Sequence, residues 1–138
     1  HHCALSDAAC ECLVLMVQDA LRGASKNDLL HQHAHPLAAA HPEFKFRAVK
    51  SAANPSGYIA DTMPAVFQSF FDTDDFHDCL IDVVNRGGDA DTTGAIAGML
   101  AGALYGTESI PSDWLKGLDA EMRALCEMQA QALLPRRN

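Results

Sequence analysis

A run of small and apolar residues with a glycine at every fourth position, from Thr92 to Tyr105, constrains the fold more than any other feature of the sequence. Gly94, Gly98 and Gly102 recur at about one helical turn, so they form a stripe along one side of a helix. Each glycine inside a helix costs about 1 kcal/mol relative to alanine, so three of them need a compensating contact. Because a stripe without side chains lets another helix approach closely, we predict a central helix buried among neighbouring helices.

The rest of the chain also carries helix signals. Apolar residues at helical spacing predict helices over residues 7–22, 61–71, 73–86 and 112–133, the last packing through Trp114, Leu115, Leu118, Met122 and Leu125. Ser25 is expected to cap a further short helix. Residues 31–55 contain three prolines and four histidines, which predicts either an irregular connection or short helices. No window alternates polar and apolar residues convincingly, so the predicted fold class is all-α.

Composition and charge exclude several classes of protein. With 138 residues, 49% hydrophobic and 20% charged, the chain has the size and composition of one globular domain. Eighteen acidic against ten basic residues give a net charge of −8, which argues against a nucleic-acid partner. The longest apolar stretch, Ala95 to Tyr105, is too short to cross a bilayer, so no transmembrane segment is expected. Five irregularly spaced cysteines and the lack of a secretory signal predict reduced thiols in the cytoplasm.

The first residues, His1, His2 and Cys3, follow no methionine. We therefore expect a piece of a longer protein, although the two histidines are also compatible with the remnant of a tag.

The segment just before the glycine-rich helix contains the candidate metal ligands. Asp89 and Asp91 are one residue apart, so in extended backbone both carboxylates point the same way and reach one ion. The hydroxyl of Thr92 adds a third hard oxygen, a donor set that suits Mg²⁺ or Mn²⁺. The alternative is that Asp91 or Thr92 is only an N-cap. We expect these acidic groups to be buried beside an apolar helix, where a partner must neutralise their charge. Arg86 is the only cation nearby in sequence, so the expected burial favours a metal.

This segment also resembles a known family. The run 84–98, followed by Ala103 to Gly106, Ile110, Pro111 and Trp114, is similar to the C-terminal signature of the ADP-ribosylglycohydrolase family. The stretches 5–9 and 55–58, with Asp61 and Thr62, look most like the members from nitrogen-fixing bacteria. The resemblance covers nearly the whole chain and is weak between about residues 25 and 53.

The resemblance implies a fold and an activity. Residues 1–138 would be the C-terminal portion of a single orthogonal all-α bundle, with the N-terminal half of the family's domain absent. Family members remove ADP-ribose from modified protein side chains, here from an arginine with dinitrogenase reductase as the expected substrate protein. The expected cofactors are two divalent metal ions, Mn²⁺ or Mg²⁺.

Matched residue by residue, the resemblance implies metal ligands at Asp89, Asp91 and Thr92 and substrate-binding residues at Tyr58 and His1. It assigns no catalytic residue, because the family's general base and its Thr-Asp-Asp-Thr type motif belong to the N-terminal half. The segment from Thr73 to Asp75 superficially copies that motif, but we interpret it as an ordinary helix cap, because it opens a helix and lacks a following threonine.

Two functions from different classes therefore stay open. One is a metal-dependent hydrolase of ADP-ribosylated arginine, incomplete in this chain. The other is a non-catalytic helical module that recognises ADP-ribose. The histidines between residues 31 and 41 allow a zinc site, but we interpret them as a solvated polar region because no cysteine or carboxylate stands at ligand spacing.

Overall fold

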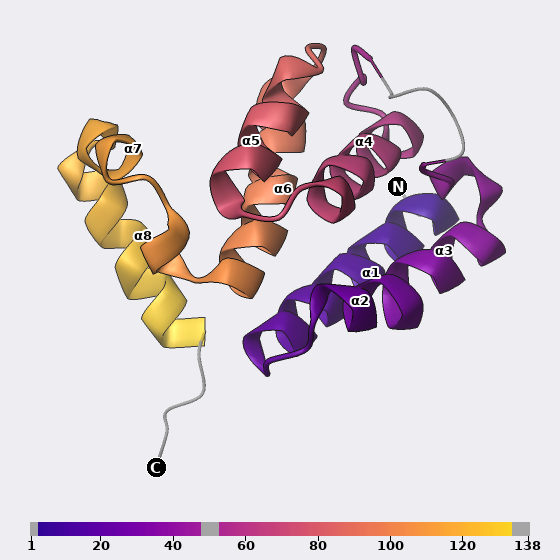
Figure 1. Ribbon diagram of the computed structural model, residues 1–138, viewed down its shortest axis with the longest axis horizontal. Coiled ribbons are helices and arrows are strands. Elements are labelled where there is room, and N and C mark those ends of the chain that lie inside the picture. Colours follow the sequence, from indigo (N-terminus) through magenta and orange to yellow (C-terminus); the bar gives the residue numbers. More distant parts are fainter. Residues whose placement is uncertain (1–2, 48–52, 134–138) are drawn as a thin grey trace.

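The computed structural model describes residues 3–47 and 53–133, and within these ranges it contains helices and no strand. The predicted all-α class is therefore confirmed. Figure 1 shows α1 to α3 together at one end, α4 to α6 in the middle, and α7 and α8 at the other end. The elements in chain order are α1 (Ala4–Leu21), α2 (Lys26–Leu29), the π-helical turn η1 (Leu30–Ala34), α3 (His35–Ala40), the 3-10 turn η2 (Pro42–Phe44), α4 (Ile59–Asp72), α5 (Phe76–Asn85), α6 (Ala90–Tyr105), the 3-10 turn η3 (Thr107–Ser109), α7 (Ser112–Gly117) and α8 (Ala120–Leu133).

Helix α6 is the central element, and it packs against α1, α4 and α5. Its glycine stripe faces α5: a methyl group at Gly98 would lie 3.7 Å from Leu80 Cδ1, and one at Gly102 would lie 3.9 Å from Phe76 Cε2. The predicted close helix contact is confirmed. Met99, on another side of α6, is 46% exposed, so this helix is not enclosed all round.

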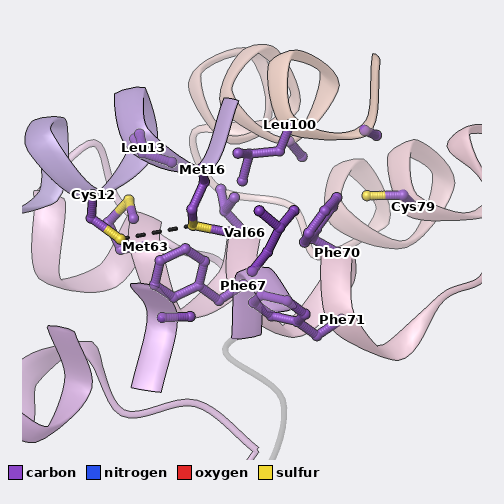
Figure 2. Packing of buried hydrophobic residues seen from close by; sticks show 14 of the residues in the cluster. Cys12, Leu13, Met16, Met63, Val66, Phe67, Phe70, Phe71, Cys79 and Leu100 are labelled. Atoms are coloured by element: carbon purple, nitrogen blue, oxygen red, sulfur yellow. Dashed lines mark hydrogen bonds between the residues drawn. The ribbon is translucent and has the colours of Figure 1, made fainter. Parts of the chain in front are cut away.

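The core includes buried residues of α1, α4 and α6, and α4 supplies three of its five phenylalanines (Figure 2). Phe67 and Phe70 of α4, Met16 of α1 and Leu100 of α6 are fully buried. Burying a side chain of this size stabilises the fold by about 1.5–3 kcal/mol. Because these four residues come from three helices, their packing holds α6 against α1 and α4.

Local signals explain the helix boundaries near the N-terminus. Helix α1 begins at Ala4, three residues before the predicted start, and ends at Leu21 before Gly23, whose φ is 96°. Ser25 caps α2 as predicted, through a reciprocal pair of hydrogen bonds with Asp28. Of residues 31–55, for which the sequence left two alternatives open, residues 31–40 and 42–44 form short helices, whereas His41 and residues 45–47 and 53–55 are irregular and 48–52 lie outside the described residues.

The prediction of one packed helix over residues 112–133 is wrong. The chain breaks between α7 and α8, where Asp119 Oδ1 accepts hydrogen bonds from the backbone N–H groups of Glu121 and Met122 and begins a new helix. The apolar side chains along this region are largely exposed, at 54% for Leu118 and 56% for Met122. Helical spacing showed which residues share a face, but the rest of the described chain leaves most of that face uncovered.

None of the helices in residues 3–47 and 53–133 combines the length and hydropathy that crossing a membrane requires. The cytoplasmic location stays a prediction.

Candidate metal-binding site at the start of α6

The turn between α5 and α6 lies against the segment that precedes α4. Asn54 N–H donates to Arg86 O at 2.7 Å, and Asp89 N–H donates to Pro55 O at 2.8 Å. Gly88, with φ 63°, lies so close to the backbone of Pro55 that a side chain would not fit there. Two segments about thirty residues apart in sequence are thus held together at the N-terminus of α6.

The turn brings together the two carboxylates that the sequence singled out. Asp89 is the N-cap of α6, with φ −80° and ψ 64°, and Asp91 belongs to the first helical turn. The expected extended backbone is therefore wrong, because the helix already begins at Ala90. The carboxyl groups nevertheless meet: a hydrogen bond with Asp89 lowers the pKa of Asp91, and the backbone N–H of Thr92 lowers it further.

Exposure at the site differs from the expectation. Asp89 is half-buried, whereas Asp91 and Thr92 are exposed. Burial therefore gives no reason for these acidic groups to need a neutralising partner. The case for a metal rests instead on the closeness of the two carboxylates, because a cation between them would offset the repulsion of their charges.

Arg86, the nearest cation in sequence, binds Asp82 and Ser69. Its guanidinium lies 2.6 Å from Asp82 Oδ2 and 2.9 Å from Ser69 Oγ, and its side chain is 8% exposed. Ser69 Oγ also donates to Asp82 Oδ2 at 2.5 Å. This network joins α4 to the end of α5, next to the turn between α5 and α6.

The donor set at the start of α6 fits a hard divalent cation. Two carboxylates and the Thr92 hydroxyl are oxygen ligands of the kind that Mg²⁺ and Mn²⁺ prefer. Space for the Asp89 carboxylate is provided by Gly57, where a methyl group would lie 2.5 Å from Asp89 Oδ2. An octahedral ion needs about six oxygens, so three protein donors leave room for water, substrate or further ligands.

Of the two predicted substrate-binding residues, Tyr58 and His1, the structure describes only Tyr58. Tyr58 is the N-cap residue of α4, is 57% exposed and directly follows Gly57. It therefore lies in the segment that contacts the Asp89 carboxylate, close to the predicted metal ligands. His1 lies outside the described residues.

The segment from Thr73 to Asp75 is a helix cap, as interpreted from the sequence. Asp75 Oδ1 accepts a hydrogen bond from the backbone N–H of Asp78 at 2.7 Å at the start of α5. Asp75, His77 and Asp78 place ligand atoms within 4.8 Å of one another, but all three are exposed. Exposed acidic clusters of this kind are common without a metal.

The histidines of residues 31–41 make separate contacts. His33 Nε2 lies 2.8 Å from Asp19 Oδ2 and joins η1 to α1, while the rings of His31 and His35 meet edge to face. No group of three metal-ligand side chains forms among these histidines in the part of the chain that the structure describes.

Sequence reasoning missed Gly57 and the contact between Pro55 and the α5–α6 turn. The paired glycines at 87 and 88 carried a signal, since two successive glycines indicate close approach of another backbone, but they did not say which segment approaches.

Comparison with known proteins identifies relatives of this chain. A family model described as ADP-ribosylglycohydrolase matches residues 1–138. The chain is 46% identical over 134 residues to the ADP-ribosyl-(dinitrogen reductase) glycohydrolase of Rhodospirillum rubrum, covering 97% of this chain and 45% of that protein. It is 35% identical over 131 residues to the ADP-ribosylarginine hydrolase Tri1 of Serratia proteamaculans (strain 568), covering 88% of this chain and 35% of that protein.

A solved structure shares the fold. The chain aligns with an ADP-ribosylglycohydrolase-related protein complex at a TM-score of 0.67 and 39% identity, covering 83% of this chain and 43% of that one. The predicted fold type is thereby confirmed. The chain spans less than half the length of the relatives that it matches. With a family model matched along its whole length, the chain belongs to the ADP-ribosylglycohydrolase family.

Proposed function

We propose that this chain supplies part of the metal centre of a hydrolase that removes ADP-ribose from modified arginine side chains, with dinitrogenase reductase as the substrate protein. The observation that carries the proposal is the contact between the carboxyl groups of Asp89 and Asp91 at the start of α6, next to Thr92, in a chain that matches the family along its length. The names of the relatives, which refer to dinitrogen reductase and to ADP-ribosylarginine, support the substrate class.

The described residues have distinct roles in this proposal. A bound Mn²⁺ or Mg²⁺ pair would orient and polarise the ribose hydroxyls of the substrate. Asp89 and Asp91 contribute carboxylate ligands, and Thr92 contributes its hydroxyl. Tyr58 offers an exposed aromatic face against which ADP-ribose packs. In the overall reaction the oxygen of water bonds to the anomeric carbon and water loses a proton, while the bond from that carbon to the guanidinium nitrogen breaks. The leaving nitrogen takes up a proton, so the products are ADP-ribose and an unmodified arginine side chain on the substrate protein.

Titration with Mn²⁺ tests the metal site directly. We expect Asp89→Asn and Asp91→Asn each to weaken Mn²⁺ binding by about tenfold or more, because each removes a charged oxygen ligand from a site with only three protein donors. Asp74→Asn is the matched control, since Asp74 is also exposed and acidic but lies away from the start of α6. Binding unchanged in both site variants would contradict the assignment.

An activity assay separates the hydrolase from the recognition module. In a full-length family member that contains this chain, we expect Mn²⁺-dependent release of ADP-ribose from an ADP-ribosylated arginine and loss of that release in Asp91→Ala. ADP-ribose binding with no release under the same conditions would favour the recognition module instead.

A further inference from the structure

The carboxylate of Asp89 fills the space that a side chain at Gly57 would need. A methyl group at Gly57 would lie 2.5 Å from Asp89 Oδ2 and 3.6 Å from Asp89 Cγ, and the first distance is shorter than any ordinary non-bonded contact. The backbone of Gly57 is outside the left-handed region, so its conformation does not require glycine. The contact with Asp89 is therefore the feature of this position that favours glycine.

The segment around Gly57 has little freedom to move away from Asp89. Thr62 Oγ1 donates to Ser56 O at 3.0 Å, and Ser56 Oγ donates to Asp61 Oδ2 at 2.6 Å, so the first turn of α4 holds the residue before Gly57. Thr62 is itself buried, with 1% of its surface exposed. On the other side, the backbone of Asp89 is tied to Pro55 O. Of the groups in contact, the end of the Asp89 side chain can rotate most easily.

We propose that Gly57 is a positioning residue for the divalent-ion site: its missing side chain leaves the Asp89 carboxylate beside that of Asp91. A side chain at this position turns the carboxylate away and separates the two ligands. The fold then persists while the site loses a ligand. This inference rests on the proposed function of Asp89 as a metal ligand.

The test compares Gly57→Ala with Gly117→Ala, because a methyl group at Gly117 meets no atom within 4 Å and its backbone is equally permissive. Thermal melting in EDTA measures the fold, and Mn²⁺ titration measures the site. We expect Gly57→Ala to melt within a few degrees of the parent in EDTA and to bind Mn²⁺ about 10 to 100 times more weakly, as for other residues that orient metal ligands. We expect Gly117→Ala to match the parent in Mn²⁺ affinity.

A double-variant cycle with Asp89→Ala shows whether Gly57 acts through Asp89. Once the Asp89 carboxylate is gone, adding Gly57→Ala should weaken Mn²⁺ binding no further. Three outcomes would each overturn the inference. They are Mn²⁺ affinity equal to the parent's in Gly57→Ala, a large fall in the melting temperature of Gly57→Ala in EDTA, and a loss of affinity from Gly57→Ala that is equal with and without the Asp89 carboxylate. If Asp89→Ala itself binds Mn²⁺ like the parent, the proposed metal site fails as well, so the two failures are distinguishable.

Discussion

At the scale of single residues, the two buried thiols differ in chemistry from the exposed ones. Desolvation raises the pKa of Cys12 and of Cys79 from 9.0 to about 11. Cys10 and Cys126 are exposed. Because the thiolate is the reactive form, burial lowers both the access to Cys12 and Cys79 and the fraction of each that can react.

Alkylation with iodoacetamide checks this difference. At pH 8 we expect the native protein to be modified at Cys10 and Cys126 and protected at Cys12 and Cys79, with protection of the buried pair persisting until the pH approaches 11. Mass spectrometry of the digested protein identifies the modified sites, and unfolded protein, in which all five cysteines should react, is the control. Fast modification of Cys12 or Cys79 under native conditions would contradict the burial seen here.

The raised pKa values of these thiols also predict how the free energy of unfolding changes with pH. Both folded-state values lie above the ordinary thiol value, so the folded protein holds protons that the unfolded chain has lost between pH 9 and pH 11. Their contribution to the free energy of unfolding is complete below pH 9 and falls as the pH rises through that window.

At the scale of elements, α6 shows how a costly residue is used for packing. Gly98 and its equivalents one turn away lie against α5 at distances that leave room for little more than a methyl group. The stripe therefore gains helix contact at the expense of helix propensity.

Two substitutions at Gly98 separate these effects. Gly98→Ala places a methyl group in ordinary contact with Leu80, so we expect it to be stabilising by up to about 1 kcal/mol through improved helix propensity. Gly98→Leu overpacks the same contact, and we expect it to reduce the free energy of unfolding by about 1–3 kcal/mol or more. Urea unfolding of both variants measures the difference. A leucine variant as stable as the parent would mean that this face of α6 is not packed against α5.

At the scale of the whole molecule, α7 and α8 contribute little to the core. Their described contacts with the preceding helices include Trp114, whose ring lies 5.4 Å from that of His77 and 6.3 Å from that of Phe76. Several large apolar side chains on α8 are exposed, including Met122 and Met128. The buried cluster instead draws its residues from α1 to α6.

Truncation tests this division. A chain that ends at Pro111 should keep a cooperative unfolding transition, with a free energy of unfolding within about 2 kcal/mol of the parent, because the removed residues bury little surface. Circular dichroism is the suitable probe, since the truncation removes the only tryptophan of the chain. A chain that ends at Asn85 lacks α6 and should show no cooperative transition. Loss of cooperativity in the longer of the two would mean that α7 and α8 are part of the folding unit.

The sequence by itself determined the features that depend on neighbouring residues. The glycine stripe of α6, the Ser25 and Asp75 caps and the stop at Gly23 follow from backbone geometry and local hydrogen bonding within a few residues. The same local reading placed Asp89 and Asp91 at the mouth of α6, although it assigned them the wrong backbone conformation.

Tertiary structure alone decided which distant segments meet. No local pattern showed that Gly57 would lie against Asp89, because that contact follows from how the start of α4 docks on the α5–α6 turn. Likewise, helical spacing marked an apolar face on residues 112–133, but only the fold showed it to be exposed. The physical reason is that periodicity reports which residues of one helix share a face, whereas packing depends on what the rest of the chain brings to that face.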